Sequence, residues 1–223
     1  MKVIITGATG FTGGALVRQA IVNDKITHAF VLTRKPLSEE LSKSEKLTII
    51  QHQDFSTYPP ELLRQLACAE ACLWTIGGRA YQFPDQETAK KVQVDFTLAA
   101  ANAFLETLAP QLPEPQKFRF VFCSGKFAEW DQTKRLIMLP RTRRLKGLVE
   151  KGLSELADAN KSRLEVWLVR PGGIVGSGAQ LMNILTANTC GFIAVDHLAR
   201  DMIQIALDGH GDRIIESNVL LKL

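Results

Sequence analysis

Three glycines near the start of the chain have the spacing of a phosphate-binding turn. Gly7, Gly10 and Gly13 lie in the segment TGATGFTGG, directly after the apolar run KVIIT. Glycines allow a tight turn after a strand and let the backbone approach a pyrophosphate closely. The free N–H groups at the start of the next helix then bind the anion. The predicted dinucleotide-binding loop therefore includes Gly7, Thr9, Gly10, Phe11, Thr12 and Gly13.

Two basic residues stand where a dinucleotide site reads the adenosine ribose. Arg34 and Lys35 follow the apolar run HAFVLT, about twenty residues after the glycine loop. An acid at this place would bind the 2′-hydroxyl of NAD, whereas basic side chains suit the 2′-phosphate of NADP. The sequence therefore predicts NADP(H) over NAD(H) as cofactor. The alternative interpretation is a solvated basic loop.

Other residues are expected around the adenosine because the loops after parallel strands form the ligand crevice of such a sheet. Asp54, at the end of an expected strand, could accept a hydrogen bond from the adenine amino group. Gly77 and Gly78 follow the run ACLWTI and would let the chain pass close to the adenosine.

Five segments together resemble the short-chain dehydrogenase/reductases: TGATGFTGG, TIGG, FCSG, LKG and RPGG. The similarity runs through essentially the whole chain. It points to the atypical, single-domain, NADPH-binding subgroup related to NmrA-like and nucleotide-sugar-epimerase-like proteins. The resemblance implies a Rossmann fold and further cofactor contacts from Pro171 and Gly172 in RPGG.

The catalytic residues of this family are only partly present. The family uses a Ser that holds the substrate oxygen, a Tyr general acid/base and a Lys four residues after the Tyr, which binds the nicotinamide ribose. Ser124 and Lys146 match the Ser and the Lys, but Thr142 stands where the Tyr belongs. Neither Tyr58 nor Tyr81 has a Lys four residues later. A Thr hydroxyl is a far weaker acid than a phenol with its pKa of about 10.

Several groups could replace the missing acid. Lys146 itself qualifies if burial lowers its pKa, and Lys126 is a second candidate. Glu129 and Asp131 lie in the loop SGKFAEWDQTK, where an apolar wall such as Trp130 would raise a carboxyl pKa. The alternative for both acids is an ordinary exposed loop.

The basic stretch 139–152 has competing interpretations. Arg143 and Lys151 fit a solvated helix face, whereas Lys146 fits a cofactor-binding helix. Arg141 could bind an anionic substrate at the mouth of the pocket. A nucleic-acid stripe is disfavoured because the stretch has no interleaved aromatic residues and the net charge is only +4.

Three functional hypotheses remain. The first is an NADPH-dependent reductase of a small or mid-sized apolar carbonyl compound, with a non-standard general acid. The second is a non-redox isomerase, cyclase or dehydratase on the same scaffold. The third is a catalytically silent protein that senses NADP(H).

Alternating strands and helices must position these residues. Strands are expected at 2–6, 28–34, 46–54, 70–77, 118–125, 164–173 and 213–223. Helices are expected at 13–23, 60–68, 85–110, 142–161 and 195–209. Short strands that are apolar throughout are typical of a parallel sheet covered on both faces. The predicted fold is a doubly wound parallel α/β Rossmann sheet, a three-layer sandwich, in one domain (1–223). A substrate lid is expected around 174–195, with GSGAQLMNIL (176–185) as its flap.

Composition excludes several classes. Hydrophobic residues make up 46% of the chain and charged residues 22%, as in ordinary globular proteins. No segment has the length of a membrane span, and no signal peptide is evident. The four cysteines and four histidines show no zinc or disulfide spacing, so no metal is expected. We therefore expect a cytoplasmic protein with a small-molecule substrate and no nucleic-acid or membrane partner. A homodimer through FTLAAANAFLETL is possible, with core packing as the alternative.

Overall fold

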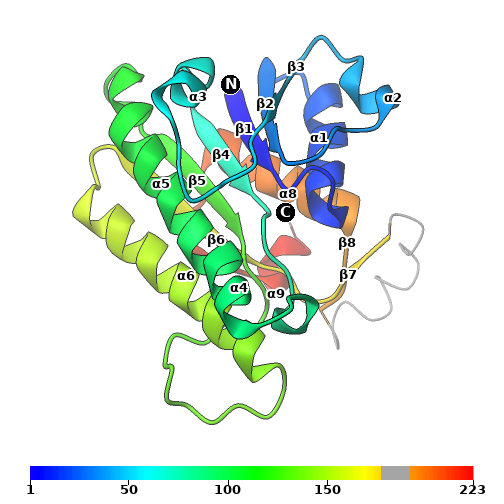
Figure 1. The fold of residues 1–223 in the computed structure, drawn as a ribbon, viewed down its shortest axis with the longest axis vertical. Coiled ribbons are helices and arrows are strands. Elements are labelled where there is room, and N and C mark those ends of the chain that lie inside the picture. Colours follow the sequence, from blue (N-terminus) through cyan, green and yellow to red (C-terminus); the bar gives the residue numbers. More distant parts are fainter. Residues whose placement is uncertain (177–190, 223) are drawn as a thin grey trace.

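A seven-stranded parallel sheet forms the centre of the computed structural model, which describes residues 1–176 and 191–222 (Figure 1). The strand order is β3-β2-β1-β4-β5-β6-β9, so the direction of the winding reverses between β1 and β4. A ligand crevice is expected at such a reversal. The strands are β1 (Lys2–Thr6), β2 (His28–Thr33), β3 (Leu47–Gln51), β4 (Ala71–Trp74), β5 (Phe118–Cys123), β6 (Leu164–Arg170) and β9 (Ile214–Glu216).

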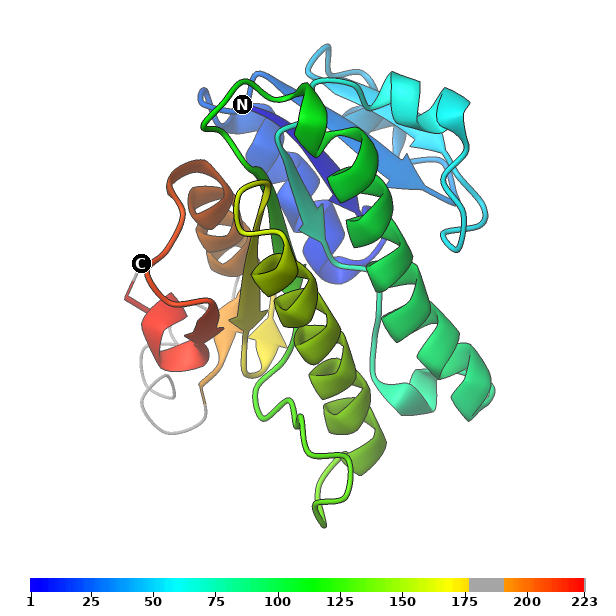
Figure 2. The same ribbon diagram turned by 90° about the vertical axis from the view of Figure 1, so that its left-hand side faces the viewer.

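Helices cover both faces of the sheet. On one face α1 (Phe11–Val22) packs against α8 (Val195–Asp208). On the other face lie α3 (Pro60–Gln65), α5 (Phe96–Thr107) and α6 (Pro140–Ala159), the last two side by side (Figure 2). Because both faces are covered, neighbouring residues of one strand such as Val3, Ile4 and Ile5 are all fully buried. The predicted doubly wound Rossmann-type α/β fold is confirmed.

The helix expected at 85–110 is interrupted. It begins with α4 (Gln86–Lys90), whose N-cap Asp85 accepts a hydrogen bond from the Thr88 N–H. A π-helical turn (Lys91–Asp95) follows and leads into α5. The apolar residues of α5, such as Phe104, pack in the core, which agrees with the core-packing alternative for this helix. A π-helical turn inside an α-helix often marks a functional site.

The C-terminal half differs from the expected pattern in two places. The strand expected at 164–173 ends at Arg170, because Pro171 cannot donate a ladder hydrogen bond. The strand expected at 213–223 ends at Glu216 and gives way to a short helix, α9 (Ser217–Leu220). Asn218 disfavours the strand, and Leu220 is fully buried from the helix.

Some small elements were not predicted. They include α2 (Glu39–Ser42) and a separate two-stranded parallel sheet of β7 (Ile174–Val175) and β8 (Ile193–Ala194). The latter two strands border the expected lid. The flap expected at 176–185 lies outside the described residues, except for Gly176.

Candidate functional site

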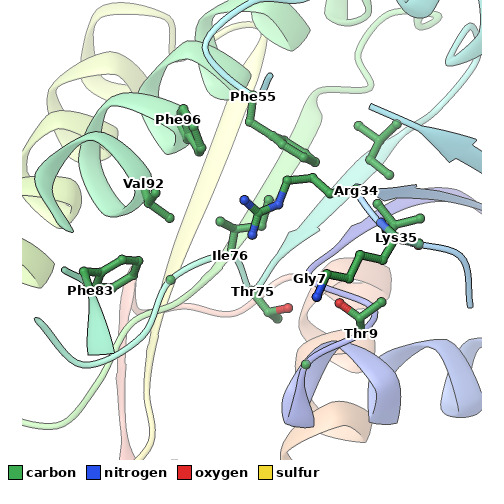
Figure 3. A pocket seen from close by; sticks show the side chains of 14 residues that line it. Gly7, Thr9, Arg34, Lys35, Phe55, Thr75, Ile76, Phe83, Val92 and Phe96 are labelled. Carbon is green, nitrogen blue, oxygen red and sulfur yellow. Dashed lines mark hydrogen bonds between the residues drawn. The ribbon is translucent and has the colours of Figure 1, made fainter. Parts of the chain in front are cut away.

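A cavity of about 260 Å³ opens at the carboxyl ends of β1, β2 and β4, where the winding of the sheet reverses. The glycine loop and two exposed basic residues form one side, and apolar side chains form the other (Figure 3). The lining residues are Gly7, Thr9, Gly10, Leu32, Thr33, Arg34, Lys35, Phe55, Thr75, Ile76, Gly77, Phe83, Val92 and Phe96.

The glycine loop is built by close backbone contacts. Gly7 has φ of +69°, and a Cβ there would lie 2.5 Å from the Thr75 Oγ1. A Cβ on Gly13 would lie 2.0 Å from the carbonyl oxygen of Gly7, so α1 starts directly against the turn. Gly10 is open to the cavity and donates its N–H to the Gly7 carbonyl. The loop thus has the geometry that a pyrophosphate needs, with the free N–H groups of α1 beside it.

Two predicted loop residues lie beside the cavity and do not line it. The Phe11 side chain is 56% exposed at the first position of α1. Thr12 follows it and is half-buried.

The side chains of Arg34 and Lys35 both extend over the cavity. The Arg34 side chain extends toward Ile76, and the Lys35 side chain extends toward Gly7 and Thr9 (Figure 3). A tight turn holds them there, because the Thr33 hydroxyl donates to the Lys35 carbonyl (2.7 Å) and accepts from its N–H (3.2 Å). Within the described residues neither forms an ion pair. None of the residues lining the cavity is acidic.

Asp54 does not line the cavity, contrary to its predicted adenine contact. The third strand ends at Gln51, three residues earlier than expected. The Asp54 carboxylate accepts a hydrogen bond from the Ser56 N–H (3.0 Å), which lowers the pKa of this exposed group. Its neighbour Phe55 enters the cavity wall instead, between Trp74 and Phe96. The wall where an adenine would lie is therefore apolar.

Lys146 does not line the cavity, but its ammonium lies next to Gly77, which does. Its Nζ lies 3.3 Å from the position that a Cβ on Gly77 would take, and it donates to the Cys123 carbonyl (3.1 Å). The ammonium also lies 4.7 Å from the centre of the Phe122 ring. Burial lowers the pKa of Lys146, as expected for a charge removed from water. Gly78 instead packs against Gln82 and Phe83.

The sequence analysis missed Gln93. Its side chain is 1% exposed, and neither amide atom has a hydrogen-bond partner among the described residues. The amide oxygen lies 3.9 Å from the Cβ position of Gly77, beside the Lys146 ammonium. The π-helical turn directs it there, and no sequence pattern predicts such a turn. The one available signal was a glutamine among the apolar positions of the helix.

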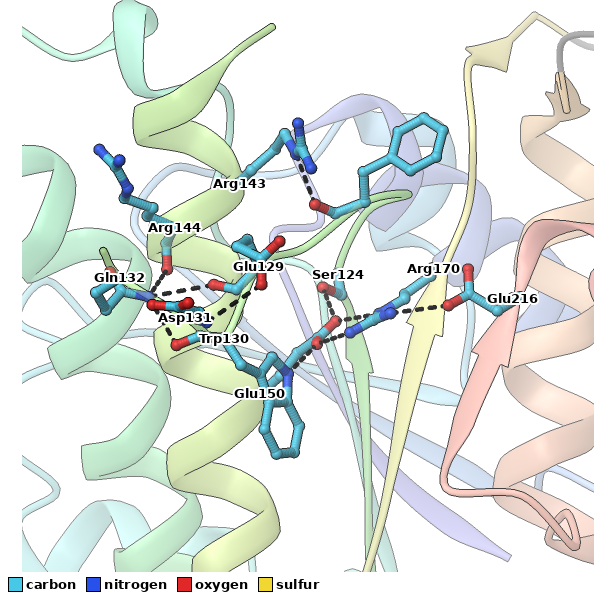
Figure 4. A network of polar contacts seen from close by, with 11 residues as sticks. Ser124, Glu129, Trp130, Asp131, Gln132, Arg143, Arg144, Glu150, Arg170 and Glu216 are labelled. Carbon is cyan, nitrogen blue, oxygen red and sulfur yellow. Dashed lines mark hydrogen bonds and ion pairs between the residues drawn. The ribbon is translucent and has the colours of Figure 1, made fainter. Parts of the chain in front are cut away.

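Ser124 is bonded to a buried carboxylate. Its hydroxyl donates to Oε1 of Glu150 on α6 at 2.5 Å, and the Glu150 side chain is fully buried. The Trp130 indole N–H donates to Oε2 of the same carboxylate (2.7 Å). The Arg170 guanidinium binds both Glu150 oxygens and also Glu216 at 2.8 Å (Figure 4). These carboxylates raise the pKa of Arg170.

This network changes the role expected for Ser124. A hydroxyl has one proton to donate, and Ser124 gives it to Glu150. It therefore does not offer a donor to a substrate oxygen in this geometry. Trp130 likewise directs its indole N–H at Glu150.

Thr142 also has its own partner. Its Oγ1 accepts a hydrogen bond from the Ala80 N–H at 2.8 Å, which attaches the segment after β4 to α6. Thr142, which the resemblance to the short-chain dehydrogenase/reductases would place at their Tyr, acts here as a structural acceptor.

Glu129 and Asp131 have lowered pKa values, which favours the alternative of an ordinary loop over a general acid. Glu129 pairs with Lys134 (2.8 Å), which lowers the pKa of its carboxyl. Asp131 is exposed, and hydrogen bonds from Thr133 lower its pKa. Both are ordinary ionised carboxylates, which does not suit a general acid at neutral pH. The Glu129 backbone packs tightly on α6, because a Cβ on Gly147 would lie 1.7 Å from its carbonyl oxygen.

Pro171 and Gly172 fix the start of the segment after β6 and do not line the cavity. The Pro171 carbonyl accepts a hydrogen bond from the Lys126 N–H (2.7 Å). A Cβ on Gly172 would lie 1.9 Å from the Gly191 carbonyl oxygen, so only a glycine fits there.

The described residues hold neither a metal-binding cluster nor a membrane-spanning helix. No group of three His, Cys, Asp or Glu side chains has a metal-binding arrangement. No helix in the described part is long and apolar enough to cross a membrane.

No protein-family model matches the chain. A curated relative is the leucinostatins biosynthesis cluster protein T of Purpureocillium lilacinum, 32% identical over 124 residues. This match covers 56% of the chain and 42% of the relative, so the chain matches less than half the length of that protein.

The fold recurs in solved structures of nucleotide-binding enzymes. Gre2 from Candida albicans in complex with NADPH has a TM-score of 0.73 at 16% identity, over 97% of this chain and 78% of that one. Pseudomonas aeruginosa RhlG with NADP has a TM-score of 0.73 at 12% identity, over 98% and 96%. DesIV, a dTDP-glucose 4,6-dehydratase from Streptomyces venezuelae with NAD bound, has a TM-score of 0.68 at 16% identity, over 100% and 80%. At these identities the likeness shows the fold.

Proposed function

We propose that the chain is a protein of the short-chain dehydrogenase/reductase type that binds NADP(H) in the cavity beside the glycine loop. The observation that carries this proposal is the placement of Arg34 and Lys35 over a cavity that no acidic residue lines. Arg suits the bidentate recognition of a phosphate, and Lys adds a point charge. NAD would find no carboxylate for its 2′-hydroxyl at this position.

The residues present fit a dinucleotide along the whole cleft. The turn at Gly7 and Gly10 and the start of α1 would hold the pyrophosphate. Phe55 would lie against the adenine. Lys146 and the unpartnered amide of Gln93 would bind the hydroxyls of the nicotinamide ribose, which gives both amide atoms of Gln93 partners.

As a reductase, the protein would act on a small or mid-sized apolar carbonyl compound. Bound NADPH supplies a hydride for the carbonyl carbon, and the carbonyl oxygen must then receive a proton. Lys146 is the proposed donor of that proton, because burial lowers its pKa and its Nζ lies at the Gly77 end of the cleft. Four other candidates are less suited as proton donors, since each already has the partner described above: Ser124, Thr142, Glu129 and Asp131.

A second candidate function follows from those same partners. Because the hydroxyls of Ser124 and Thr142 are bonded to Glu150 and the Ala80 N–H, the substrate end of the cleft has few free donors. A protein that binds NADP(H) without turnover would have this arrangement. A non-redox isomerase, cyclase or dehydratase is the remaining alternative on this scaffold.

The test is a fluorescence titration of the whole chain with NADPH and NADH, followed by a screen of carbonyl compounds. Micromolar NADPH binding, at least tenfold tighter than NADH binding, supports the cofactor assignment. Carbonyl-dependent NADPH oxidation that is lost in Lys146→Met then identifies the reductase. NADPH binding without turnover on any carbonyl favours the sensor. Failure to bind either nucleotide overturns the proposal.

A further inference from the structure

A second cavity, of about 700 Å³, lies between the start of α4 and the start of α6. These two helix ends are neighbours at the bottom of the molecule in Figure 1. Phe83 lines this cavity and also the one beside the glycine loop, so its ring stands between them. The two cavities share no other lining residue, and the second one is therefore a separate place for a ligand.

The second cavity has a basic wall. Arg141 and Arg144 line it from the first turns of α6. The Arg144 Nε is buried and has no hydrogen-bond partner in the described structure, while its NH2 donates to the Lys134 carbonyl (2.9 Å). Neither arginine forms an ion pair among residues 1–176 and 191–222. The two guanidinium groups are thus without a carboxylate partner in the described structure, and an anion in the cavity would neutralise them.

The acids of the cavity lie on the other helix. Asp85 and Glu87 belong to the start of α4. Both oxygens of Asp85 already accept hydrogen bonds from Thr88, at 2.7 and 2.9 Å. Lys90 of α4 also lines the cavity, so this side carries both signs of charge, whereas the α6 side contributes only the cations Arg141 and Arg144. The arginine side is therefore the place for an anionic group.

Aromatic side chains form the remaining wall. The ring of Tyr81 is held in place, because the Arg79 guanidinium donates to its hydroxyl (2.8 Å) and lies 6.0 Å from its centre. Phe83 and Leu145 add apolar surface. The bond from the Ala80 N–H to Thr142 fastens this segment to α6, so the aromatic and basic walls keep their distance. A flat apolar body would lie on this wall with its charged end at the arginines.

We propose that the second cavity is a binding site for aromatic monocarboxylates, distinct from the dinucleotide cleft. The guanidinium of Arg144 pairs with the carboxylate, and Arg141 adds a second cation. Tyr81 and Phe83 pack against the ring of the ligand. A charged acceptor at a desolvated guanidinium forms one of the stronger hydrogen bonds in proteins, so the charge of the ligand should dominate its recognition.

The test is calorimetric titration of the whole chain, without nucleotide, with 2-naphthoate and with the neutral 2-naphthylmethanol. We expect saturable naphthoate binding and at least tenfold weaker binding of the alcohol. Arg144→Gln should weaken naphthoate at least tenfold, and Tyr81→Ala, which changes an exposed side chain, at least fivefold. Arg135→Gln removes the same charge from an exposed residue that does not line the cavity, and it should change the affinity less than twofold.

Three outcomes would overturn the site: no saturable binding of naphthoate, equal binding of acid and alcohol, or equal losses in the Arg144 and Arg135 variants. Circular dichroism of each variant separates a local loss from unfolding, and Tyr81→Ala keeps the test decisive if Arg144→Gln does not fold. None of the three variants changes a residue of the dinucleotide cleft. Failure here therefore leaves the NADP(H) proposal intact, and the reverse also holds.

Discussion

The hydroxyl of Ser124 donates a 2.5 Å hydrogen bond to Glu150, a fully buried carboxylate on the helix that also carries Lys146. This hydroxyl therefore donates to a group in the interior of the protein. Arg170 and Trp130 complete the same network and join β6 and the loop after β5 to α6. The functional consequence is that Lys146 and Gln93 become the main polar groups at that end of the cleft.

Replacing one or the other partner of this hydrogen bond should lower the free energy of unfolding by very different amounts. Ser124→Ala leaves the carboxylate held by Arg170 and Trp130, and we expect a loss of about 1–2 kcal/mol in the free energy of unfolding. Glu150→Gln removes the charge that Arg170 faces in the interior, and we expect a loss of about 3–5 kcal/mol. Urea unfolding at neutral pH measures both. Ser154→Ala, a buried hydroxyl of α6 without a partner in the described structure, is the control and should cost less than either. Equal losses for Ser124→Ala and Glu150→Gln would refute the network.

The nucleotide preference should depend on Arg34. We expect Arg34→Ala to weaken NADPH binding at least tenfold, which corresponds to about 1.4 kcal/mol, and to change NADH binding less than twofold. Lys35→Ala should have a smaller effect in the same direction, since an ammonium makes a single point contact. Arg64→Ala, an exposed arginine outside the cavity, is the control. Equal losses of NADPH and NADH would show that Arg34 does not read the 2′-phosphate.

The glycine loop should tolerate no side chain at position 13. An added Cβ would lie 2.0 Å from the Gly7 carbonyl oxygen, so Gly13→Ala must move α1 away from the turn. We expect it to abolish nucleotide binding and to destabilise the fold by about 3 kcal/mol or more. Gly211→Ala is the matched control, because a Cβ there has no neighbour within 4 Å. Thermal unfolding and NADPH titration compare the two. Normal NADPH binding by Gly13→Ala would contradict the loop geometry.

The titration of Lys146 should make the free energy of unfolding depend on pH in the alkaline range. Burial lowers its pKa in the folded protein, whereas the unfolded chain keeps a value of about 10.4. Between these two values the unfolded chain binds more protons, so the free energy of unfolding rises as pH rises toward 10.4. Lys146→Met cannot titrate and should lose this rise. Urea unfolding at several pH values from about 8 to 10 measures it, with exposed Lys151→Met of the same helix as control. Parallel curves for wild type and Lys146→Met would contradict a lowered pKa.

Local sequence patterns were sufficient to predict the parallel sheet and the glycine loop. Runs such as KVIIT are apolar at every position, which is what a strand between two helical layers requires. Arg34 and Lys35 were predictable because the distance along the chain from a glycine loop to the end of the next strand varies little. Asp54 was predicted to end the third strand, but β3 ends at Gln51. A sequence pattern places the end of a strand only to within a few residues.

The contacts around Glu150 depend on elements that are far apart in the sequence. In the sequence, Glu150 is one more charged residue of a basic helix. Its spacing from Lys146 and Leu153 nevertheless places it on the buried side of that helix. Its partners come from β5, β6 and the intervening loop, and no local pattern pairs them. The π-helical turn that buries Gln93 likewise depends on packing against α6.

The last strand of the sheet, β9, has three residues and is followed at once by a helix. A short edge strand leaves few backbone groups free for pairing with another chain. The Arg170–Glu216 ion pair fixes its end to β6 by side chains, so a longer ladder is not needed to keep it in place. This side of the sheet is thereby protected from edge-to-edge aggregation.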